Sequence, residues 1–122
     1  MGKLALVAKI THVPSIVLSE FDGPRKGTRQ DAIDGLRQIG QRCRDLGVDT
    51  LVVLDTHWLV NASYHINCAA HWQGHYTSNE LPHFISNMPY AIPGNPDLGQ
   101  LLARTARDHG VETLAHAATT LA

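Results

Sequence analysis

Two Thr-His pairs, Thr11-His12 and Thr56-His57, are the residues in this sequence best suited to chemistry. Each pair follows a short apolar run, at residues 4–10 and 51–54. Neutral imidazole is the commonest side-chain metal ligand, and two histidines with one carboxylate leave open positions on a divalent iron. If His12 and His57 meet in the fold, they predict a metal site. Their spacing alone also allows a structural or incidental role for both pairs.

The two apolar runs must position these histidines. Short apolar runs bounded by turn residues are typical of strands buried on both faces of a parallel sheet. In open α/β sheets the carboxyl ends of the strands form the edge where ligands bind. We therefore predict strands at residues 4–10 and 51–54, with His12 and His57 converging at one edge. Asp55 could orient His57 from behind as a hydrogen-bond partner, or it could be a strand-end acid satisfied by backbone amides.

A helix is predicted between the two runs. Thr28 is a suitable N-cap after a loop at residues 18–27, and Gly47 is placed to end the helix. Apolar residues at three- and four-residue spacing predict a face that packs on the sheet. These residues are Ile33, Leu36, Ile39, Cys43 and Leu46.

The second half of the chain predicts further elements of the same fold class. Residues 63–69 alternate enough for a third strand, and residues 111–115 suggest another short one. Between them, Asn95, Pro96 and His109 mark the start and end of a second helix. Residues 71–96 are rich in proline and glycine and are expected to be an irregular cover over a site or an interface. The predicted fold is three-layer α/β/α with a central, largely parallel sheet.

Composition excludes several classes of function. The net charge is −1, and the ten Lys and Arg residues are scattered, so we expect no nucleic-acid partner. No segment approaches the roughly 20 apolar residues of a membrane span, so we expect no membrane partner. Cys43 and Cys68 form no Cys-x-x-Cys motif and are expected to be reduced thiols of a cytoplasmic protein.

A resemblance to a known family gives the two Thr-His pairs a specific meaning. Five pieces of the sequence carry it, in matching order along the chain: residues 9–15, 53–60, 64–69, 76–84 and 94–101. In these pieces the sequence resembles the class III extradiol ring-cleaving dioxygenases. The resemblance implies that His12 and His57 ligate Fe(II), with Mn(II) as an alternative ion. It also implies a catechol substrate such as 3,4-dihydroxyphenylacetate, O2 as co-substrate and assembly as a homo-oligomer.

Two elements of the family's site have no counterpart in this sequence. The family's third metal ligand is a glutamate, and its acid–base residue is a histidine; both are expected beyond residue 122. Asp55, Glu20 and Glu80 are local carboxylates, but none matches that glutamate. The chain also ends in an apolar, small-residue run, which suggests truncation. We therefore expect residues 1–122 to be the N-terminal part of one catalytic domain and to be inactive alone.

Other functions stay open at this point. A zinc-dependent hydrolase on a similar sheet is one alternative, and a non-enzymatic binding relative of the family is another. His71 and His75 have a spacing that would suit zinc on a helix, although Gly74 favours loop histidines instead. His116 follows the last predicted strand, and its simplest interpretation is a strand-end residue.

Overall fold

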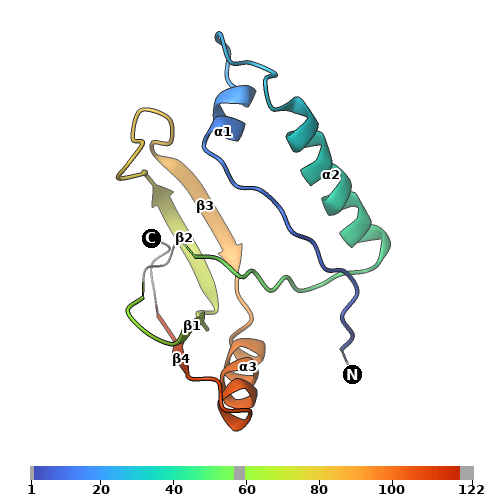
Figure 1. The fold of residues 1–122 in the computed structure, drawn as a ribbon, viewed down its shortest axis with the longest axis vertical. Helices are drawn as coiled ribbons and strands as arrows, with labels where there is room; N and C mark the ends of the chain where they lie inside the picture. Colours follow the sequence, from blue (N-terminus) through green and yellow to red (C-terminus); the bar gives the residue numbers. More distant parts are fainter. Residues whose placement is uncertain (1, 57–59, 119–122) are drawn as a thin grey trace. The chain divides into compact units, whose positions relative to one another are not determined.

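The computed structural model describes residues 2–56 and 60–118. These residues form a mixed α/β structure with three helices and two sheets of two strands each (Figure 1). They divide into two compact units. The first contains residues 2–51 with 78–85, and the second contains the other described residues. No helix in the described ranges has the length and apolar character that crossing a membrane would require.

The first unit contains two helices, α1 (Ser15–Glu20) and α2 (Gln30–Asp45), which pack against each other. The predicted apolar face of α2 is only partly buried, because Ile33 is buried and Leu36 half-buried but Leu46 is exposed. In the described residues α2 packs on α1 and contacts no strand, so the predicted packing of this face on the sheet is not seen. The polar residues Arg37 and Gln41 are exposed. Gly47 follows the helix with a positive φ of 65°, which is the left-handed conformation expected of a residue that ends a helix.

The start of α2 differs from the prediction. Thr28 does not cap the helix; its Oγ1 donates to the Arg25 carbonyl at 2.9 Å, and α2 begins at Gln30. The segment predicted as a loop also contains the end of α1. The N-cap residue is Arg29, and no side chain makes a capping hydrogen bond to α2. The Arg29 N–H itself donates at 2.9 Å to the Oγ of buried Ser19, which belongs to α1 and lies outside the local sequence of α2.

The second unit contains a parallel pair of strands, β1 (Tyr64–Asn67) and β4 (Thr113–His116). Both correspond to predicted strands. The intervening helix α3 (Pro96–Asp108) packs on both strands, and its predicted N-cap is confirmed because the Asn95 Oδ1 accepts from the Leu98 N–H at 3.0 Å. Figure 1 shows α3 beside β4.

The contact between α3 and the parallel pair is close. Ala103 on α3 is fully buried, and the Thr113 hydroxyl donates to its carbonyl at 2.9 Å. Gly99, one turn earlier, faces Cys68, which is 3% exposed. A Cβ at Gly99 would lie 2.7 Å from the Cys68 Sγ, so only glycine fits there without displacement.

Residues 71–96 are more regular than predicted. Strands β2 (His71–Tyr76) and β3 (Met88–Pro93) form an antiparallel hairpin, so the expectation of an irregular segment was wrong. Alternate residues of β2 are half-buried, including Trp72 and Tyr76. The prolines of β3 masked this pattern in the sequence, but proline is compatible with a strand that has a free edge.

The predicted strands at residues 4–10 and 51–54 are absent from the structure. Both segments are without helix or strand, and most of their apolar side chains are exposed, with Leu4 at 84% and Leu54 at 93%, while Leu6 is half-buried. The apolar pattern identified residues that favour burial. A strand also needs a neighbour for its backbone hydrogen bonds, and neither segment pairs with a strand in the described ranges.

Replacing Gly99 by alanine should destabilise the protein, although glycine-to-alanine changes inside helices usually stabilise. The new methyl group would press on Cys68, and overpacking of this kind costs about 1–3 kcal/mol. Gly35 in α2 is the matched control, because nothing lies within 4 Å of its Cβ position. Gly35→Ala should raise the free energy of unfolding by about 0.5–1 kcal/mol. Urea unfolding of both variants measures whether each change lowers or raises the free energy of unfolding. A stabilising Gly99→Ala would refute the close contact between Gly99 and Cys68.

Asn95→Ala should lower the free energy of unfolding by about 1 kcal/mol, because the Leu98 N–H loses its acceptor. Asn95→Asp keeps an oxygen at the same place and should be close to the parent in urea unfolding. An equal loss of unfolding free energy in both variants would show that the oxygen of the Asn95 side chain does not stabilise the start of α3.

Candidate functional site

His12 lies in the extended segment that leads into α1. Its side chain is exposed, and residues 9–13 line a shallow hollow of about 530 Å³. Pro14 precedes the first residue of α1 and separates the histidine from the helix. The imidazole is therefore placed where an ion or a substrate could reach it.

His57, the residue predicted to meet His12, lies outside the described residues. The convergence of the two imidazoles therefore stays a prediction. Asp55 is described and exposed, and its support of His57 also stays a prediction. In the described ranges, no group of three or more His, Cys, Asp or Glu side chains is placed to hold a metal ion.

The two other local carboxylates, Glu20 and Glu80, are both exposed. The Glu20 carboxylate lies 3.8 Å from the Arg37 guanidinium, as an exposed ion pair between α1 and α2. Glu80 is exposed in the segment between β2 and β3.

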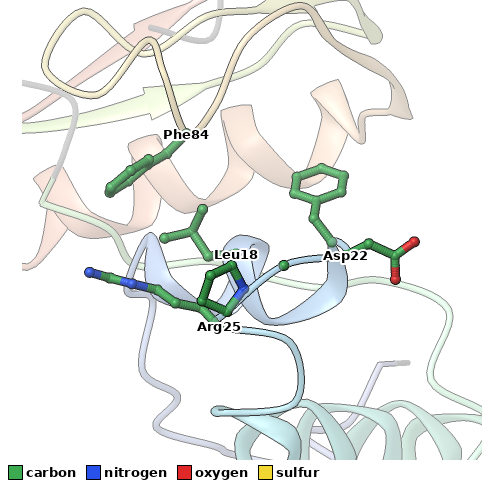
Figure 2. A pocket seen from close by; sticks show the side chains of 7 residues that line it. Leu18, Asp22, Arg25 and Phe84 are labelled. Atoms are coloured by element: carbon green, nitrogen blue, oxygen red, sulfur yellow. The ribbon is translucent and has the colours of Figure 1, made fainter.

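A hollow of about 270 Å³ lies in the first unit, beside α1 (Figure 2). Its walls are mainly apolar, with Leu18, Phe21, Pro24 and Phe84 among them. Figure 2 shows the Phe84 ring facing Leu18, while the carboxylate of Asp22 points away from both. Of the predicted metal ligands, His12 is the one that the structure describes, and it does not line this hollow.

The structure brings together two histidines that the sequence did not predict as a pair. His65 on β1 and His116 at the end of β4 are half-buried, and the His116 Nε2 lies 3.0 Å from the His65 Nδ1. The ring planes are 18° apart and the centroids 4.9 Å apart. The rings are nearly parallel and offset, and the N···N distance lies in the range of a hydrogen bond. Parallel pairing of β1 with β4 creates this contact, and no local sequence signal reveals that register.

The remaining histidines have separate environments. His71 and His75 are exposed positions of strand β2, which excludes the helical zinc motif considered from their spacing. The His83 ring packs edge-on against Phe84, with centroids 4.1 Å apart. The His109 Nδ1 lies 2.8 Å from the Thr105 carbonyl oxygen at the end of α3.

Comparison with known proteins decides the family. Residues 6–121 match the family described as the catalytic LigB subunit of aromatic ring-opening dioxygenase. The chain belongs to the LigB family. The resemblance found in the sequence is thereby confirmed, and the match includes the segments around both Thr-His pairs.

A curated relative of this LigB chain is the 3,4-dihydroxyphenylacetate 2,3-dioxygenase of Escherichia coli. The two are 64% identical over 116 residues, which is 95% of this chain. The matched region is 42% of the relative's length, so the LigB chain spans less than half of that enzyme.

Proposed function

We propose that this chain forms the N-terminal part of the catalytic domain of a non-haem Fe(II)-dependent extradiol dioxygenase. The enzyme would open the ring of a catechol such as 3,4-dihydroxyphenylacetate with O2. The observation that carries this proposal is the 64% identity to the E. coli enzyme over 95% of the chain. The LigB family match over residues 6–121 supports the same reaction class.

His12 and His57 are the residues proposed to hold the metal. The fit rests on donor chemistry, since imidazole suits Fe(II), and on the exposure of His12 beside a hollow. Mn(II) is compatible with the same donors. When bound, the ion would supply Lewis-acid and redox chemistry to a chelated catechol and O2. Asp55 would orient the His57 imidazole by accepting its second ring N–H.

Residues beyond 122 are proposed to complete the site. The third ligand would be a glutamate and the acid–base residue a histidine, as the family resemblance implies. We further propose that β1 and β4 belong to a larger, mainly parallel sheet in a three-layer α/β/α domain. The exposed apolar segments at residues 4–10 and 51–54 support this, because apolar surface of that extent favours burial.

We also propose a cytoplasmic enzyme that assembles as a homo-oligomer. The free thiols of Cys43 and Cys68 are compatible with a reducing compartment. The assembly proposal rests on the family resemblance and on the exposed apolar side chains, which would favour association.

A chimera tests the proposed ligands. This chain would replace the matching region of the E. coli relative, and oxygen uptake would be measured with Fe(II) and 3,4-dihydroxyphenylacetate. The chimera should turn over, whereas His12→Gln and His57→Gln should each lose most activity and bind less iron. His75→Gln is the matched control, because His75 is an exposed strand residue, and it should keep activity. A folded but inactive chimera, or full activity in His12→Gln, would contradict the proposal.

The 122 residues alone should bind Fe(II) poorly and cleave no catechol. Two imidazoles lack the third ligand and its negative charge, and each ligand contributes to metal affinity. Iron titration and oxygen uptake of the chain and of the chimera give the comparison. Strong binding with turnover by the chain alone would mean that a local carboxylate completes the site.

A further inference from the structure

The hydrogen bonds around His65 determine which of its nitrogens carries hydrogen. The His65 Nε2 lies 3.2 Å from the Ala62 carbonyl oxygen. A carbonyl oxygen can only accept, so the His65 Nε2 must be the donor. The Ser63 hydroxyl donates to the same oxygen at 2.6 Å, which its two lone pairs allow. In the neutral ring, the His65 Nδ1 is then the unprotonated nitrogen.

The same reasoning extends to His116. Its Nε2 lies 3.0 Å from the His65 Nδ1, so one of the two nitrogens must donate. Since the neutral His65 has no hydrogen on Nδ1, the donor is the His116 Nε2–H. A neutral imidazole carries only one N–H, and the His116 Nδ1 therefore bears the lone pair.

We propose that His65 is a positioning residue that holds His116 in the Nε2–H tautomer through the chain Ala62 carbonyl, His65, His116. In the neutral ring the Nδ1 of His116 is then the nitrogen that carries no hydrogen. This assignment does not depend on the dioxygenase proposal.

The parallel register of β1 with β4 places His65 and His116 side by side. His65 is paired with Leu114 and Asn67 with His116, so the two histidines lie two residues apart along neighbouring strands. Residues two apart point to the same face of a sheet, and diagonal neighbours are within reach of long side chains. A shift of one residue in the register would turn one ring to the opposite face and break the chain.

Nitrogen NMR of the ¹⁵N-histidine-labelled protein tests the proposal at about pH 8, where ordinary imidazoles are neutral. The expected spectrum shows a protonated Nε2 on His116 with a scalar coupling across the hydrogen bond to an unprotonated Nδ1 of His65. His109 is an internal control of the opposite tautomer, because its Nδ1 must donate to the Thr105 carbonyl. A proton on the His65 Nδ1, or no coupling between the two rings, would overturn the proposal.

Two variants separate positioning from simple packing. In His65→Leu the coupling should vanish and the His116 Nε2–H should exchange with water several-fold faster, while the His109 signals stay unchanged. In His65→Asn the side-chain oxygen can accept near the position of Nδ1, so the slow exchange should return. Unchanged His116 signals in a folded His65→Leu protein would refute the role of His65. If His65→Leu does not fold, the parent spectrum and His65→Asn still decide the question.

Discussion

The parallel pairing of β1 with β4 is the constraint on which the second unit depends. Parallel strands need a long crossover connection, and residues 68–112 provide it as the β2–β3 hairpin followed by α3. The crossover must also cover the pair, and α3 does so with Gly99 and Ala103 against the strands. A small side chain at each of these positions sets how closely the helix can approach. The same pairing brings His65 to His116, so packing and the histidine contact have one cause.

Local signals predicted the local elements well. The Asn95 cap, the proline after it and the glycine beyond His109 correctly delimited α3, because each signal acts within one turn of the helix end. The spacing of apolar residues located the buried Ile33 of α2, but not what covers it, since α2 contacts α1 and no strand in the described residues. The failure at Thr28 shows the limit of this reasoning. The acceptor that serves the Arg29 N–H is Ser19, ten residues earlier, and cap preferences do not consider a side chain from another helix.

Strands were predicted less reliably than helices, because a strand forms only beside a neighbouring strand that pairs with it. The short segments that became β1 and β4 have weak patterns, yet each pairs with the other. The runs at residues 4–10 and 51–54 have stronger apolar patterns but are exposed and unpaired in the described ranges. Hydrophobicity indicates that a segment favours burial, whereas pairing supplies the backbone hydrogen bonds that make it a strand. The hairpin of β2 and β3 was missed for the converse reason, since its prolines hid two segments that do pair.

The candidate sites follow the same division. His12 could be singled out from sequence because its Thr-His motif is local, and it lies within the range that matches the LigB family. His65 and His116 could not be paired from sequence, because their contact arises from a register between strands far apart in the chain. A histidine at a strand end is thus only a candidate until its neighbours are known. For His12 the family resemblance implies His57 as the neighbour, which stays a prediction, and for His116 the sheet itself brings His65 close. The proposed metal ligands and the His65–His116 pair therefore rest on different observations, and a test that refutes one leaves the other unaffected.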